Sequence, residues 1–188
     1  MYRNSGQYER AIAEFDKPLR LKPDDAATYH SCGIVYYHLK QYEWAITDFD
    51  EALHLKPDYA SMYYDRGVAY LNLKQHERAL ADFDVAIRLK PNYPDAFFGR
   101  GAVYDKLTQH ERAITAYTEA LRLRPDDAMA YYSRGYAYYS VSQYERAIAD
   151  FDEVIRLNPE NAVARQSRTA AYRMLERAGS STVDDLKS

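Results

Sequence analysis

Aromatic and small side chains recur at helical spacing between residues 60 and 93. Tyr63, Gly67 and Tyr70 follow the i, i+4, i+7 spacing that places residues on one face of a helix. Polar residues at 74–76 then predict a turn. The pattern therefore predicts two helices that pack through small residues, with aromatic side chains around them. The stripe on the second helix consists of Ala79, Phe83 and Ala86.

The same pattern recurs along the chain at a step of 34 residues. A fixed period of this size indicates stacked units, each of which buries its apolar face against its neighbours. We therefore expect an all-α fold of stacked helix pairs. The clearest columns are Gly33, Gly67, Gly101 and Gly135; Pro23, Pro57, Pro91, Pro125 and Pro159; Ala11, Ala45, Ala79, Ala113 and Ala147; and Phe15, Phe49, Phe83, Tyr117 and Phe151.

Prolines and short polar residues predict where the helices begin and end. Pro91 lacks an amide hydrogen and disfavours helix in the residue before it, so the second helix should end near Leu89. Pro94 suits the first position of the next helix. The turns within the helix pairs should centre near Gln41, Gln75, Gln109 and Gln143. Helix N-caps are expected from Asp25, Asp58, Asn92, Asp127 and Asn161.

The repeated columns resemble the signature of the tetratricopeptide repeat. In the copy at 60–93 the matching residues are Tyr63, Gly67, Tyr70, Ala79, Phe83, Ala86 and Pro91, with tyrosine in place of the usual tryptophan. Pentatricopeptide repeats, which bind RNA, have a longer period and lack this pairing of glycine and alanine, so we exclude them. The resemblance covers roughly residues 2–175. It implies a right-handed superhelical solenoid whose first helices line a concave groove.

The repeat predicts a single domain over residues 1–178. A partial repeat at 1–25 precedes four full repeats at 26–59, 60–93, 94–127 and 128–161. A C-terminal helix at 162–178 has Arg165 and Thr169 where its predecessors have an aromatic residue and a glycine. It is expected to cap the stack, because a last helix gains from a polar outer face. Residues 179–188 are expected to form a flexible tail.

Composition and charge exclude several other classes of protein. The chain of 188 residues has a formal net charge of −3 with both signs interspersed, so neither nucleic acid nor a membrane surface is an expected partner. The single cysteine, Cys32, excludes an internal disulfide and fits a reducing compartment. No apolar run typical of a signal peptide follows Met1, so we expect a cytoplasmic protein.

A separate face of the predicted first helices holds ring side chains at 34-residue spacing, formed by His30, Tyr64, Phe98 and Tyr132. Exposed apolar rows are costly in water unless they bind something, so we interpret this face as a groove for a partner protein. The alternative is that these residues only pack against neighbouring first helices. The predicted groove residues are His30, Ile34, Tyr37, Tyr64, Asp65, Val68, Asp95, Phe98, Ala102, Asp105, Met129, Tyr132, Tyr136 and Tyr139.

Charges on the groove predict the kind of segment that it binds. Asp65, Asp95 and Asp105 favour an apolar protein or peptide segment that contains Lys or Arg. Tetratricopeptide domains that bind the acidic C-terminal tails of heat-shock chaperones have cations on this face. Here the corresponding positions include Asp65 and Asp95, so we exclude chaperone tails as ligands.

A second charged column lies beside the glycines and contains Arg66, Arg100, Arg134 and Arg168, with Cys32 in the first repeat. We interpret these arginines as structural, with Asp48, Asp50, Asp82 and Asp84 as their partner acids. A row of phosphate-binding side chains is the alternative.

No motif in the sequence indicates catalysis. His30 and His38 lack the Cys or carboxylate pattern of a zinc site. Phosphate loops, Gly-rich dinucleotide turns and nucleophile elbows are not found in the sequence. We therefore expect no enzymatic activity, no bound metal and no cofactor.

Two classes of function remain. The leading prediction is a scaffold or adaptor that binds a segment of a partner protein in the concave groove. The alternative is a structural or self-assembly module, or a repeat segment of a larger multidomain protein. The helix predicted at 7–21 lacks a companion for apolar residues such as Phe15, so homo-oligomers through residues 1–21 are expected.

Overall fold

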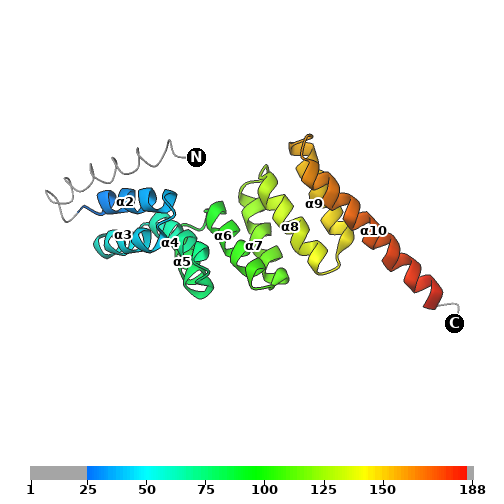
Figure 1. Cartoon of the computed structure of the whole chain (residues 1–188), viewed down its shortest axis with the longest axis horizontal. Coiled ribbons are helices and arrows are strands. Elements are labelled where there is room, and N and C mark those ends of the chain that lie inside the picture. The colour runs from blue at the N-terminus through cyan, green and yellow to red at the C-terminus, as the bar shows by residue number, and fades with distance from the viewer. Residues whose placement is uncertain (1–24, 186–188) are drawn as a thin grey trace. The chain divides into compact units, whose positions relative to one another are not determined.

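The structure is a computed structural model that describes residues 25–185. Within this range it contains nine α-helices and no strands, which confirms the expected all-α class (Figure 1). The helix predicted at 7–21 and the association expected through residues 1–21 lie outside the described residues. In chain order the helices are α2 (Ala26–His38), α3 (Tyr42–Leu55), α4 (Ala60–Asn72), α5 (His76–Leu89), α6 (Pro94–Lys106), α7 (His110–Leu123), α8 (Ala128–Ser140), α9 (Tyr144–Leu157) and α10 (Ala162–Asp185).

The chain divides into two compact units, Met1–Gly99 and Arg100–Ser188, with the boundary inside α6. We call them unit 1 and unit 2. The first helices of the repeats are α2, α4, α6, α8 and α10, and the second helices are α3, α5, α7 and α9. The single domain expected over residues 1–178 stays a prediction.

In unit 1, α2 packs against α3 and α4 packs against α5. Helix α3 also packs against α4, which joins the two pairs. The glycine column allows this close approach. A Cβ added to Gly33 would lie 2.5 Å from Phe49 Cε1, and one added to Gly67 would lie 3.0 Å from Phe83 Cε1. A larger side chain at either glycine could enter only by displacing the ring. The predicted packing of small residues against aromatic rings is confirmed.

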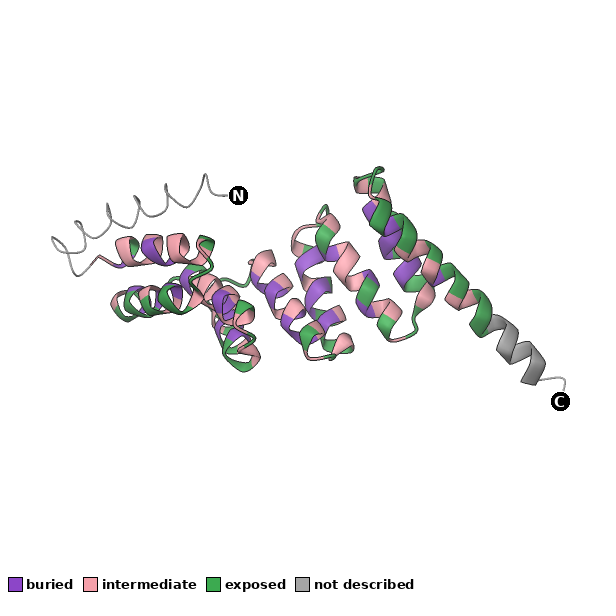
Figure 2. Ribbon diagram, viewed as in Figure 1, coloured by how far each residue is buried: buried purple, intermediate pink, exposed green. Residues whose placement is uncertain are grey.

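In unit 2, α8 packs against α7 and α9, and α10 packs mainly against α9. The side chains buried between these helices include Phe151 and Ile148 of α9 and Ala171 of α10. Within each unit, buried residues lie where helices face each other (Figure 2). Within residues 25–185, no helix is both long enough and apolar enough to cross a lipid bilayer.

The turns between paired helices lie where the sequence predicts them. Gln41, Gln75, Gln109 and Gln143 each precede the first residue of a second helix. The residue before each of them adopts the left-handed conformation although none is glycine. These residues are Lys40, Lys74, Thr108 and Ser142, with φ of 61°, 60°, 55° and 60°.

The N-caps confirm part of the prediction and correct the rest. The side chains of Asp25 and Asp127 accept backbone hydrogen bonds at the starts of α2 and α8, and Asn161 does so for α10. The predicted caps Asp58 and Asn92 are wrong. Tyr59 is the N-cap of α4, and the carbonyl of Tyr93 accepts the first hydrogen bonds of α6, because these tyrosines occupy the 34-residue column of Asp25 and Asp127.

The helix boundaries next to Pro91 and Pro94 follow the prediction, whereas the end of the last helix, α10, differs from it. Helix α5 ends at Leu89 and α6 begins at Pro94, as expected. Helix α10 continues to Asp185, past residue 178, where the sequence placed its end and the start of a flexible tail. Gly179 does not stop it, because one glycine inside a helix costs only about 1 kcal/mol and no proline follows.

Candidate functional site

The arginine column holds the repeats together. Arg66 donates two hydrogen bonds to Asp82, at 2.8 and 2.7 Å, and one to Asp50 at 2.5 Å. Arg134 donates two to Asp150, both at 2.8 Å. Both guanidinium groups are mostly buried. The structural interpretation of these two arginines is therefore confirmed, and the phosphate-binding alternative is not supported at either.

The repeat at 26–59 lacks the arginine of this pair. Asp48 occupies the column of Asp82 and Asp150, but Cys32 stands where they have an arginine. Asp48 Oδ2 is buried and has no hydrogen-bond partner among the described residues. Burial, followed by the nearby charge of Glu51, raises the pKa of Asp48 to about 6. The missing arginine thus leaves a carboxylate that resists ionisation.

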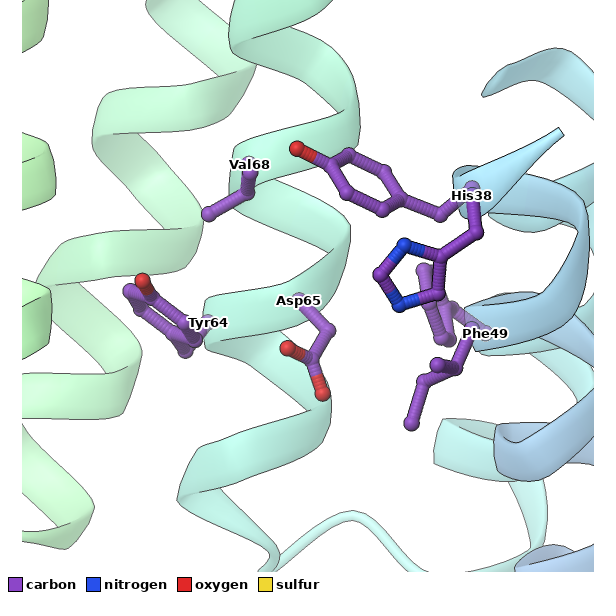
Figure 3. Close-up of a pocket in the computed structure, with 7 residues that line it drawn as sticks. His38, Phe49, Tyr64, Asp65 and Val68 are labelled. Atoms are coloured by element: carbon purple, nitrogen blue, oxygen red, sulfur yellow. The ribbon is translucent and has the colours of Figure 1, made fainter. Parts of the chain in front are cut away.

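The first-helix side of unit 1 contains a pocket of about 240 Å³ between α2, α3 and α4. We define the unit 1 face as this pocket and the predicted groove residues His30, Asp95 and Phe98. In Figure 3 the Asp65 side chain lies between Tyr64 on one side and His38 and Phe49 on the other. The structure brings together five of the predicted groove residues here and adds two others. The pocket is lined by Ile34, Tyr37, His38, Phe49, Tyr64, Asp65 and Val68.

Asp65 connects two first helices on this face. Its Oδ2 lies 2.6 Å from His30 Nε2, so the pair joins α4 to α2. The side chain of Asp65 is 28% exposed. A second contact between the same helices is made by Asn72, which donates to the Tyr37 hydroxyl at 3.3 Å. Each of these two pairs therefore includes a predicted groove residue that also holds α2 and α4 together.

The predicted ladder of rings rests on the aromatic column of the second helices. His30 lies 5.7 Å from Phe49, between ring centres, and Tyr64 lies 5.9 Å from Phe83. In unit 2, Tyr132 lies 5.7 Å from Phe151. These ladder residues are only partly buried, so one side of each ring packs while the rest reaches the surface. These ring contacts are with second helices, whereas the alternative was packing against neighbouring first helices, and the ladder residues stay partly at the surface.

Asp105 has a different environment from Asp65. One of its oxygens accepts a hydrogen bond from the Tyr117 hydroxyl at 2.9 Å, and the other lies 3.1 Å from His110 Nδ1. Both oxygens are engaged by α7, the partner of α6. The neighbouring groove position, Ala102, is partly buried on the same helix.

The first-helix side of unit 2 is apolar and exposed. Met129 is 67% exposed and Tyr136 is 53% exposed. Together with Tyr132 and Tyr139 they define the unit 2 face. One pocket of about 350 Å³ is lined by Ala128, Met129, Tyr132, Asn161 and Val163. A second pocket of about 180 Å³ is lined by Tyr136, Tyr139, Phe151, Ser167 and Ala170.

Models of known families match most of the sequence. One, described as the tetratricopeptide repeat, matches residues 98–162, and a second, described as the TPR repeat, matches residues 1–40, 35–74 and 70–108. The chain belongs to the tetratricopeptide-repeat family. Its fold is accordingly an all-α tetratricopeptide solenoid, as the sequence predicts.

Solved structures of other tetratricopeptide proteins have a similar fold. MamA matches with a TM-score of 0.78 and 28% identity, over 85% of this chain and 94% of the MamA chain. A MamA structure from Desulfovibrio magneticus RS-1 matches with a TM-score of 0.77 and 25% identity, over 84% and 89%. YrrB, described as a TPR protein with an unusual peptide-binding site, matches with a TM-score of 0.74 and 26% identity, over 87% and 84%. None of the curated protein sequences compared with this chain matches it.

The tetratricopeptide period could have revealed residues of the site that the sequence analysis missed. Val163 and Ala170 of α10 line the pockets of unit 2 and lie 34 residues after Met129 and Tyr136. They were missed because α10 was interpreted only as a cap. Phe49 was missed because it was assigned to the core, although its ring also forms a wall of the unit 1 pocket.

His, Cys, Asp and Glu side chains form pairs rather than larger clusters in the described part of the chain. Over residues 25–178, no three His, Cys, Asp or Glu side chains come together in a way that could hold an ion. His30 lies with Asp65, and His110 with Asp105, as separate pairs.

Proposed function

We propose that this tetratricopeptide protein is a non-enzymatic scaffold that holds a segment of a partner protein on its first-helix faces. Tetratricopeptide relatives support the general role of protein interaction. The observation that supports this location best is the exposure of Met129 and Tyr136 beside two apolar pockets. Large apolar side chains gathered on one surface are typical of protein interaction sites.

The chemistry of the faces favours an apolar segment. Aromatic side chains and methionine are the residues most enriched at protein interfaces, and they supply most of this surface. YrrB is a precedent for peptide binding in a protein of similar fold. The carboxylates of Asp65 and Asp95 favour Lys or Arg within the bound segment and disfavour an acidic chaperone tail.

The test compares pull-downs with the wild-type chain and with two variants. Met129→Ala combined with Tyr136→Ala removes apolar surface from the unit 2 face, and both positions are exposed enough for the fold to tolerate the change. Trp44→Ala is the matched control, because Trp44 is 63% exposed on a second helix, α3. We expect mass spectrometry to find partners that bind wild type and Trp44→Ala but are depleted about tenfold or more by the double variant.

Two results would contradict the proposal. Partners that bind the double variant as well as wild type would place the contact elsewhere. Partners lost only on Trp44→Ala would move the contact to the second helices. Circular dichroism should show the same helix content in all three proteins.

A further inference from the structure

The two first-helix faces differ in charge. Asp65 and His38 line the pocket of unit 1. The two pockets of the unit 2 face are lined by uncharged side chains, whereas a further pocket of unit 2, on α10, is lined by residues that include Arg165 and Arg173. The one charged side chain on α8, Arg134, is bound to Asp150, and Asp105 is engaged by Tyr117 and His110.

Asp65 is able to accept a further hydrogen bond. His30 occupies Oδ2, and no hydrogen bond to Oδ1 is found among the described residues. The Asp65 side chain is partly exposed and lines the pocket (Figure 3). A Lys or Arg side chain of a ligand could therefore donate to Oδ1 without breaking the contact with His30.

A second carboxylate and two aromatic rings lie near Asp65. The rings of Tyr64 and Tyr93 are 5.2 Å apart. Burial raises the pKa of Tyr93, and the nearby charges of Asp65 and Asp95 raise it further, so both carboxylates act on the same hydroxyl. Lys90 already lies 4.6 Å from the centre of the Tyr93 ring, so a cation is accommodated at this tyrosine. Negative charge beside aromatic rings suits a second cation.

The two pockets of the unit 2 face offer a different chemistry. Their polar groups are the hydroxyls of tyrosine and serine and the amide of Asn161. The Tyr132 hydroxyl lies 3.3 Å from Ser167 Oγ, so these two groups satisfy each other. Burying a charged side chain here would leave it without an opposite charge, which is unfavourable.

We propose that the two units bind different side chains of a partner: the unit 1 face binds a Lys or Arg through Asp65, and the unit 2 face binds uncharged apolar side chains. This assignment rests on the proposed scaffold role. The occupant is a partner protein that has a basic segment for the unit 1 face and an apolar segment for the unit 2 face.

A displayed library of random short peptides, selected on the full chain, tests the assignment. The proteins to compare are wild type, Asp65→Asn, Asp65→Lys and the control Asp58→Asn, which removes the same charge from an exposed loop of unit 1. We expect wild type and Asp58→Asn to enrich peptides with Lys or Arg beside apolar residues. Asp65→Asn should lose the preference for cations, and Asp65→Lys should favour Asp or Glu.

A synthetic peptide taken from the wild-type selection should bind Asp65→Asn about tenfold more weakly, as expected for the loss of one charge-assisted hydrogen bond. If Lys and Arg are no more frequent in peptides selected on wild type than in peptides selected on Asp65→Asn, the assignment is overturned and the scaffold role stays intact. Selected peptides that bind all face variants as well as wild type would overturn the scaffold role itself.

Discussion

Single residues in the arginine column decide how neighbouring helices are joined. Arg134 gives the clearest example of a buried ion pair, since its guanidinium and the Asp150 carboxylate are both mostly buried. The pair satisfies two charges that the helix packing removes from water. The same geometry recurs at Arg66 and Asp82, so the interaction belongs to the repeat and not to one site.

Removing Arg134 should destabilise unit 2 strongly. Arg134→Ala leaves Asp150 buried without its partner, and breaking such a pair typically costs about 3 kcal/mol or more. Urea denaturation followed by circular dichroism measures the loss. Arg146→Ala is the control. Among the described residues, Arg146 is exposed and contacts Gln143 and the Tyr138 ring, so its loss should cost less than about 1 kcal/mol. Equal losses in the two variants would contradict the role of the buried pair.

Asp48 should make the stability of the chain depend on pH. Its pKa in the folded chain is about 6, above the ordinary value of 3.8, so the folded state binds this proton more tightly than the unfolded state does. The resulting stabilisation is present below about pH 4 and is lost as the pH rises to about 6. The shift corresponds to about 3 kcal/mol for a fully buried group, and partial exposure reduces this to about 1 kcal/mol.

Asp48→Asn should therefore be more stable than wild type by about 1 kcal/mol at pH 7, because the amide does not ionise. The advantage should disappear near pH 4. Chemical denaturation at the two pH values measures this, with the exposed Asp58→Asn as control. An advantage of Asp48→Asn that is the same at both pH values would show that ionisation of Asp48 is not the cause.

At the scale of the helical elements, each pair is joined by a turn that contains a left-handed residue. This conformation lets backbone amides after the turn bond back to the last carbonyls of the first helix. In the α6/α7 turn, for example, Gln109 N donates to Tyr104 O at 2.9 Å. Glycine is the residue that adopts this conformation most easily, yet none of the four positions has one.

Thr108 is the least suited of these residues, because its branched side chain crowds the backbone at a φ of 55°. Thr108→Gly should raise the free energy of unfolding by about 0.5–1 kcal/mol, after allowing for the greater freedom of glycine in the unfolded chain. Thr115→Gly, inside α7, should lower it by a similar amount. Thermal denaturation should show opposite shifts in Tm, and shifts of the same sign would contradict the explanation.

At the scale of the whole molecule, the chain consists of two compact units that are each held by contacts between adjacent helices. Repeat proteins with such contacts have stability that is distributed locally. In unit 2 the last helix contributes Ala171, which is fully buried against Ile148 and Phe151. The capping helix is therefore part of the core of that unit.

Ala171→Glu should open unit 2 and leave unit 1 protected. Burying an unpaired carboxylate there should cost about 3 kcal/mol or more. Hydrogen exchange should become faster in α8, α9 and α10, with little change in α2–α5. Gln166→Glu, exposed on the same helix, should leave exchange unchanged. Equally faster exchange in α2–α5 would show that the two units unfold together.

The sequence alone determined the repeat, the helix pairs and the contacts within each repeat. The 34-residue period aligns each glycine of the column with an aromatic ring, and it aligns Arg66 and Arg134 with an acid. These contacts join residues at a constant separation along the chain. The tetratricopeptide family, the turns at Gln41, Gln75, Gln109 and Gln143 and the structural role of Arg66 and Arg134 all follow from it.

The tertiary structure decided which side chains of the predicted groove remain available. The sequence assigned Asp65 and Asp105 the same role, but one lines a pocket while the other is engaged by Tyr117 and His110. The tertiary structure also decided that α4 and α6 begin after Tyr59 and Tyr93 and that α10 extends to Asp185. Periodicity places a residue on a helix face, whereas the direction and partner of its side chain depend on what the neighbouring helices present to it.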